Sequence, residues 1–203
     1  AHEMSRQSGK PYICARKGEK LYMADPVVVE DQSITTAGKQ KLVIDRKELD
    51  KMSGKRVLVV HPFRKTILSQ YEKRAQLFPG RDILPEFASL TVIQAVQGLA
   101  GQDTGYDSWF DALDAMKRKM DAADYDVAII GAGAYGLPLA AHARDTGHAA
   151  IQMSGATQLL FGIKGRRWDD HPVISKLYNP AWVRPDESEG ITNKEKVEGG
   201  SYW

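Results

Sequence analysis

The chain has 203 residues and a mass of 22.5 kDa, enough for one α/β domain and short for two. Its 28 Lys and Arg residues nearly balance 26 Asp and Glu residues, which excludes a general electrostatic nucleic-acid binder and a disordered acidic tail. A single cysteine, Cys14, excludes an internal disulfide and suits a reducing compartment, so a cytoplasmic protein is expected. The longest uncharged stretch, residues 127–143 with His neutral, is interrupted by glycine and proline, so no membrane span is expected.

The pattern of the chain changes near residue 55. Residues 1–54 contain few apolar clusters and are predicted to form an arm or short strands that complete the domain. Beyond them, the apolar run at residues 57–60 (VLVV) predicts a buried strand that ends at His61. Residues 66–77 carry apolar side chains four residues apart and therefore predict a helix.

The rest of the chain alternates strand and helix patterns. A second strand is predicted at residues 90–96, a glycine-rich loop at 98–105, and then a helix capped by Asp107 or Ser108. Further strands are predicted at residues 127–130 and 149–151, and further helical segments at residues 135–145 and 154–161. Because strands that alternate with helices form parallel sheets covered on both faces, the sequence predicts a single Rossmann-like α/β domain over residues 55–203, with a mostly parallel sheet flanked by helices.

The segment between a predicted strand and a predicted helix reads GAGAYG, a G-x-G-x-x-G motif with Gly131, Gly133 and Gly136. Its glycines allow a tight turn and a close approach of the backbone, and a helix N-terminus attracts phosphate. A dinucleotide site would add an acidic residue about 20 residues on, whereas the next strand continues as IQMS up to Ser154. The motif therefore favours a phosphate-bearing ligand other than NAD or FAD, with a turn that binds nothing as the alternative.

A basic segment follows the last predicted strand and contains Lys164, Arg166, Arg167 and Trp168. Arginine forks bind phosphate oxygens through two parallel hydrogen bonds, and an indole stacks on a base or a sugar ring. The alternative is a solvated basic loop with Trp168 anchored in the core. Because loops at the carboxyl ends of parallel strands share one edge, this segment and the glycine motif are expected to be neighbours.

Other kinds of site receive less support. His61 again comes directly after a predicted strand, so it adds an imidazole to the same edge of the sheet, and two basic residues follow it. The alternative is a structural cap, which is the more common role of a lone His before Pro. The five histidines are scattered and only one cysteine occurs, so no spacing typical of a metal site is found. The motifs G-x-S-x-G and G-x-x-x-x-G-K-[ST] are absent, which disfavours acyl transfer and P-loop phosphoryl transfer.

Three segments of the sequence carry a resemblance to a known family, and they read KRVLVVHPFRKTILSQYEKR, YDVAIIGAGAYGLPLAAHARDTGHAAIQMSGATQLLFGIKGRRWD and VEGGSYW. Together they resemble a bacterial group of glycosyltransferases with the GT-D type of fold, over about residues 55–203. The resemblance implies transfer of a sugar from a UDP- or GDP-linked donor to a glycan or glycoconjugate acceptor, in surface polysaccharide or glycoprotein assembly. In this group an N-terminal strand carries an Arg, a Gly and an acidic residue near the donor, and residues 12–19 (YICARKGE) look like a shortened version.

The resemblance also implies roles for single residues. A leaving diphosphate needs a divalent cation, Mn²⁺ or Mg²⁺, or else basic side chains and helix N-termini. Glu19 is the implied metal ligand or base, with His61 in reserve. The implied donor-binding residues are Arg16, Gly131, Gly133, Tyr135, Gly136, Ser154, Gly155, Gln158, Lys164, Arg166, Arg167 and Trp168. Two alternatives remain open: a non-catalytic nucleotide- or glycan-binding domain of the same fold and, less favoured, an NAD(P)-dependent oxidoreductase.

Overall fold

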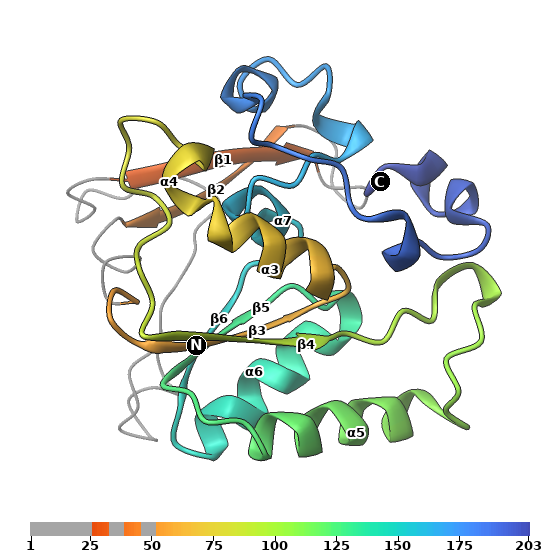
Figure 1. Ribbon diagram of the computed structural model, residues 1–203. Coiled ribbons are helices and arrows are strands. Elements are labelled where there is room, and N and C mark those ends of the chain that lie inside the picture. Colours follow the sequence, from red (N-terminus) through yellow and green to blue (C-terminus); the bar gives the residue numbers. More distant parts are fainter. Residues whose placement is uncertain (1–25, 33–38, 46–51) are drawn as a thin grey trace.

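The computed structural model describes residues 26–32, 39–45 and 52–203 (Figure 1). Its main sheet has four strands in the order β4-β3-β5-β6, and every neighbouring pair is parallel. The strands are β3 (Arg56–His61), β4 (Ser89–Gln94), β5 (Val127–Ile130) and β6 (Ala149–Gln152). This sheet and its flanking helices confirm the predicted Rossmann-like α/β domain.

A separate two-stranded sheet precedes the main sheet in the chain. Its strands, β1 (Pro26–Gln32) and β2 (Lys39–Asp45), run antiparallel to each other. Both lie within the segment that the sequence predicts to be an arm or short strands.

Helices cover both faces of the main sheet (Figure 1). One face carries α5 (Trp109–Asp121) and α6 (Gly136–Asp145), and the other carries α3 (Arg64–Glu72), α4 (Arg74–Leu77) and α7 (Ala156–Leu160). Successive strand residues point to opposite faces, so β3 contributes to two cores: Val57 and Val59 to the α3 side, Leu58 and Val60 to the α5 side. None of the described helices is long and apolar enough to cross a bilayer.

One helix begins where the sequence predicts, and another does not. Ser108 caps α5 as predicted, because its Oγ accepts a hydrogen bond from the Asp111 N–H at 3.2 Å. The helix predicted at residues 66–77 instead begins at Arg64 and breaks at Lys73 into α3 and α4. Apolar spacing marks the face that packs on the sheet, but it does not mark where the backbone leaves the helical conformation.

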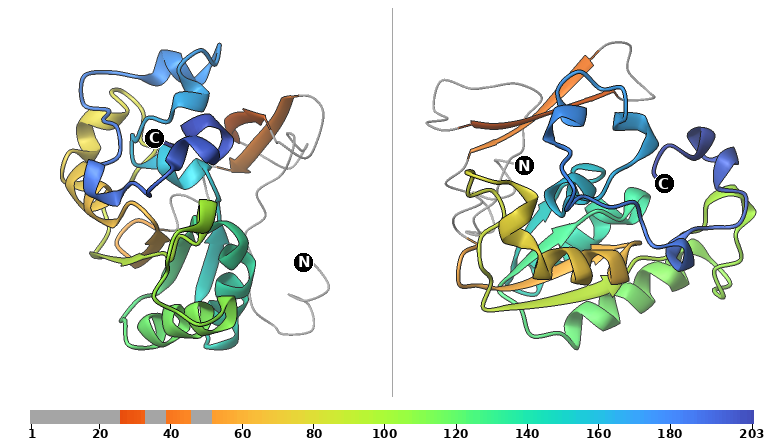
Figure 2. Two further views of the ribbon diagram at one scale, coloured as in Figure 1. Left: turned by 90° about the vertical axis from the view of Figure 1, so that its right-hand side faces the viewer. Right: turned by 45° about the horizontal axis from the view of Figure 1, so that its top comes forward.

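Residues 161–203, here called the C-terminal segment, lie on the α3 side of the domain (Figure 2). The segment contains short 3-10 turns and one isolated parallel bridge. Side chains hold it in place: the Trp182 indole N–H, for example, donates a hydrogen bond to the Leu77 carbonyl at 2.8 Å. Its last aromatic residues pack back onto the body, and the ring centroid of Trp203 lies 6.2 Å from that of Phe63.

Candidate functional site

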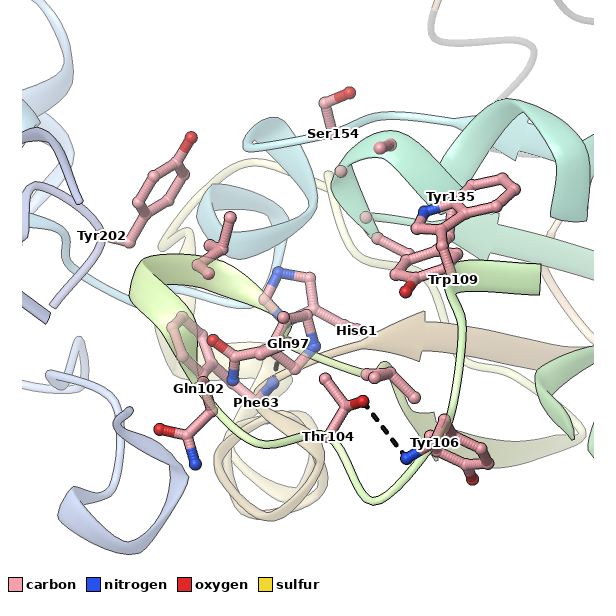
Figure 3. A pocket seen from close by; sticks show the side chains of 18 of the residues that line it. His61, Phe63, Gln97, Gln102, Thr104, Tyr106, Trp109, Tyr135, Ser154 and Tyr202 are labelled. Carbon is pink, nitrogen blue, oxygen red and sulfur yellow. Dashed lines mark hydrogen bonds between the residues drawn. The ribbon is translucent and has the colours of Figure 1, made fainter. Parts of the chain in front are cut away.

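A pocket of about 740 Å³ lies at the carboxyl ends of the parallel strands (Figure 3). His61 at the end of β3, Gly131 directly after β5 and Ser154 beyond β6 all line it. Along the chain, β4 is added on one side of β3 and β5 on the other, so the strand order reverses between β3 and β5. Open α/β sheets bind ligands at such a reversal, and small-molecule pockets typically have volumes of roughly 300–1,000 Å³.

The glycine motif forms the turn beside His61. A Cβ on Gly131 would lie 2.7 Å from His61 Cδ2 and 2.7 Å from Thr157 Oγ1, so the close packing of three segments requires glycine there. Gly133 has a φ of +52°, which favours glycine, but a Cβ on it would meet no described atom within 4 Å. Gly131 is therefore needed for packing, whereas Gly133 is needed for the backbone conformation.

Three backbone amides of this turn have no hydrogen-bond acceptor among the described residues. The Gly131 N–H donates to the Val60 carbonyl and the Tyr135 N–H to the Ala132 carbonyl. The amides of Ala132, Gly133 and Ala134 between them remain unpaired within the described chain, and all three residues line the pocket. Because α6 follows directly, the positive end of its dipole adds to these donors, and the turn favours an anionic group.

His61 is buried, with 4% of its surface exposed, and it lines the pocket. Its Nδ1 accepts a hydrogen bond from the Phe63 N–H at 3.0 Å, so the neutral ring carries its proton on Nε2. No described residue accepts a hydrogen bond from Nε2. Burial lowers the pKa of His61 from 6.5 to about 3, so the ring stays neutral at physiological pH. His61 is therefore suited to donate a hydrogen bond. It is less suited to the role of general base, for which the resemblance implies it as the second choice after Glu19.

Gln158 is a second buried polar side chain in the lining, with 1% of its surface exposed. Its Nε2 donates to the Lys164 carbonyl at 3.0 Å and to the Tyr202 carbonyl at 2.8 Å. No described group donates a hydrogen bond to its Oε1. The two hydrogen bonds fix the carboxamide and leave Oε1 as an acceptor for a ligand.

Aromatic rings form much of the pocket wall. Trp109 and Tyr135 stack with their centroids 4.8 Å apart and their planes 6° from parallel. Figure 3 shows Tyr202 on the opposite side of the pocket from this stack. Flat rings of this kind bind the face of a base or a sugar ring.

The loop between β4 and α5 supplies polar groups that the sequence prediction missed. Gln97, Gln102 and Thr104 line the pocket (Figure 3), as does Asp107, the one charged side chain among the described lining residues if His61 is neutral. The position of this loop in the sequence could have indicated these residues, because the loop also follows the carboxyl end of a parallel strand, where ligands bind. Trp109 was missed for another reason: it shares the apolar face of α5 that packs on the sheet, but it lies in the first turn and reaches the pocket.

The basic segment lies behind this wall and does not line the pocket. The Arg167 guanidinium carbon lies 3.8 Å from the centroid of the Tyr202 ring, which belongs to the pocket wall. Arg166 points elsewhere and donates to the Gly199 carbonyl at 2.9 Å, while the Lys164 ammonium lies 5.3 Å from the centroid of the Tyr178 ring. Arg167 thus packs against a side chain of the pocket wall.

Trp168 lies in the hydrophobic core, with 1% of its surface exposed. A buried indole has no free face for a base or a sugar, so the position of Trp168 agrees with the alternative of a core anchor. At the edge of the pocket, Ser154 adopts a left-handed conformation with φ of +48°, which a non-glycine residue rarely occupies. Such backbone strain is common at ligand-binding sites.

The predicted site residues fall into three groups. One group lines the pocket: His61, Gly131, Gly133, Tyr135, Ser154, Gly155 and Gln158. A second group does not line it: Gly136, Lys164, Arg166, Arg167 and Trp168. The third group, Arg16 and Glu19, lies outside the described residues.

The described residues do not fit a divalent cation. They contain no group of three or more His, Cys, Asp or Glu side chains placed to hold a metal ion. Asp107 alone would give a hard cation one carboxylate, whereas Mg²⁺ and Mn²⁺ prefer several oxygen ligands.

Comparisons with protein-family models, with curated proteins and with solved structures found no match to this chain. The pocket's own residues are therefore the basis for assigning a function.

Proposed function

We propose that the pocket binds a nucleotide-sugar donor and that the protein is a glycosyltransferase. The transfer would deliver a sugar from a UDP- or GDP-linked donor to a glycan or glycoconjugate acceptor, as in surface polysaccharide or glycoprotein assembly. The observation that carries the proposal is the row of unpaired amides at Ala132, Gly133 and Ala134, located where the strand order reverses. Oriented amides at this position suit the diphosphate of such a donor.

The diphosphate becomes a leaving group during transfer and gains negative charge. Fixed amides and a helix N-terminus stabilise such charge without having to reorganise. Arg167 adds a positive charge to the positive ends of these amides. Its guanidinium packs on the Tyr202 ring and lies close to Gly155 at the pocket edge. A metal ion has no part in this account.

The acceptor hydroxyl must lose a proton when it attacks the sugar. Asp107 supplies the carboxylate among the described lining residues, and it is exposed at the pocket edge. A carboxylate within hydrogen-bond reach of the attacking hydroxyl accepts its proton in the transition state. We therefore assign the base to Asp107, while Glu19 stays a prediction outside the described residues.

A second candidate is a binding domain without catalytic activity. The state of His61 favours it, because a neutral ring with Nδ1 already bonded and Nε2 protonated has no lone pair for a proton. The third candidate is an NAD-dependent oxidoreductase. It is disfavoured because this chain has no acidic residue directly after β6 to bind the ribose of the dinucleotide.

Ligand binding separates these classes first. UDP, GDP, UDP-glucose, GDP-mannose and NAD are each tested by thermal shift and calorimetry; a ligand at 100 times its Kd stabilises the fold by about 2.7 kcal/mol. We expect stabilisation by a nucleoside diphosphate and its sugar derivative but not by NAD. Gly133→Val should lose this binding, since its side chain would enter the pocket beside the amides. Stabilisation by NAD alone would overturn the proposal.

Release of labelled sugar then separates the enzyme from the binding domain. Asp107→Asn should lower release about 10²- to 10⁴-fold while donor affinity stays within threefold. Asp170→Asn, an exposed carboxylate outside the pocket, is the matched control and should behave like the parent. A parent protein that binds donor but never releases sugar with any acceptor favours the binding domain.

A further inference from the structure

His61 and Gln158 share an unusual arrangement in the pocket. Each side chain is more than nine-tenths buried, and each is fixed by hydrogen bonds through one of its polar atoms. The other polar atom, Nε2–H of His61 and Oε1 of Gln158, has no described partner, and both residues line the pocket. The buried wall thus offers a ligand one donor and one acceptor, both uncharged.

A hydroxyl group fits this pair better than a charged group does. It accepts a hydrogen bond from the imidazole N–H and donates its own proton to the carboxamide oxygen. A phosphate has acceptors only and would face Oε1 with repulsion, whereas an ammonium has donors only and would leave the imidazole N–H unpaired. Charged ligand atoms are therefore disfavoured at these two residues.

Packing places the pair beside the unpaired amides. A Cβ on Gly131 would touch both His61 and Thr157, which directly precedes Gln158, and Gly131 begins the turn that presents the amides of Ala132 to Ala134. In a nucleotide sugar, the diphosphate joins the transferred sugar to the ribose, and both carry hydroxyl groups, whereas the base lies one unit further away. A hydroxyl bound next to the diphosphate site thus belongs to the transferred sugar or to the ribose, and comparing a nucleoside diphosphate with its sugar derivative separates the two, because only the ribose is present in both.

We propose that His61 and Gln158 bind a hydroxyl of the transferred sugar and so determine which sugar the protein accepts; this inference rests on the proposed function. Both side chains are held before the ligand arrives, so little ordering is needed on binding. A donor that lacks the matching hydroxyl leaves two buried polar atoms unpaired, which is a strong basis for discrimination.

Two variants of His61 isolate the contact. Asn at this position can still accept from the Phe63 N–H but has no atom where Nε2 lies, whereas Gln can return an N–H to that place. Affinities are measured by calorimetry for uridine, UDP and the tightest of UDP-glucose, UDP-galactose and UDP-N-acetylglucosamine, or for the guanosine series if GDP binds instead. We expect His61→Asn to lose roughly tenfold for the sugar nucleotide and less than twofold for the diphosphate, with His61→Gln within threefold of the parent.

Deoxy analogues test the same contact in the parent protein, so the result does not depend on whether a variant folds. Among sugar nucleotides that each lack one sugar hydroxyl, we expect one to bind roughly tenfold more weakly than the complete donor. Equal losses for sugar nucleotide and diphosphate in His61→Asn, or binding of every deoxy analogue within threefold, would overturn the inference alone. If no nucleotide binds the parent, the proposed function fails first, and this assignment fails with it.

Discussion

Gly131 and His61 are packed so closely that a single added carbon on the glycine would lie 2.7 Å from the imidazole Cδ2. Gly131→Ala must therefore displace His61 or Thr157, and we expect it to lower the free energy of unfolding by about 1–3 kcal/mol. Gly133→Ala is the matched control, because its Cβ meets open space and only the positive φ costs about 1 kcal/mol. Urea unfolding measures both, and a Gly131→Ala protein as stable as the parent would contradict the packing.

The buried neutral state of His61 makes stability depend on pH. Its pKa is about 3 in the folded protein and ordinarily 6.5, so below pH 6.5 the unfolded chain takes up a proton that the folded chain does not. His61 therefore lowers stability as pH falls, with a slope approaching about 1.4 kcal/mol per pH unit, until pH 3 is reached. Urea unfolding at pH 7, 6, 5 and 4 should show a stability difference between parent and His61→Asn that changes with pH. A constant difference would mean that His61 titrates normally.

Glu189 caps a helix that lacks a cap of its own. Phe63 at the N-cap of α3 offers no side-chain acceptor, and the Glu189 carboxylate accepts from the amides of Lys65 and Thr66 at 2.5 and 3.0 Å. Glu189 is also 5% exposed, so loss of its charge weakens buried hydrogen bonds. Glu189→Gln should destabilise the fold by about 1–3 kcal/mol. Glu187→Gln, two residues earlier and exposed, should change stability by less than about 0.5 kcal/mol; equal effects in the two variants would refute the cap.

The adjacent arginines of the basic segment should contribute unequally to ligand binding. Arg167 packs on the Tyr202 ring in the pocket wall, whereas Arg166 reaches the Gly199 carbonyl. Arg167→Ala removes both a cation near the proposed diphosphate site and the guanidinium that packs on Tyr202, so donor-nucleotide affinity should fall roughly tenfold or more. Arg166→Ala should change it less than about threefold. Calorimetry at fixed salt measures both, and the reverse order would contradict this geometry.

Local patterns predicted much of the fold. The VLVV run, the Ser108 cap and the glycine motif each act over a few neighbouring residues, and each occurs where the sequence predicts it. The strand order β4-β3-β5-β6 is different, because the choice of the side on which β5 pairs with β3 depends on the whole sheet. The break at Lys73 likewise has no strong local signal.

The site was harder to predict than the fold for a related reason. Its glycine turn is continuous in sequence, but its walls come from Trp109 and Tyr202, which reach the pocket only after folding. Trp168 illustrates the opposite error: an indole beside arginines suggests a ligand contact, yet the same side chain is large enough to be a core anchor and is buried as one. Residue type alone does not separate these outcomes.

The hydrogen bond between Glu189 and Thr66 joins residues that are 123 positions apart, which has a consequence for the order of folding. During synthesis, the strands of the main sheet and α3 leave the ribosome long before residue 189 does. The start of α3 therefore stays uncapped until residue 189 has been made, and the wall formed by Tyr202 stays absent until residue 202 has been made. Contacts of such long range form slowly because the intervening loop must first be closed. A nascent chain with its sheet already paired thus has the glycine turn but not a complete pocket, and the pocket can be completed only after residues 189–202 have been made.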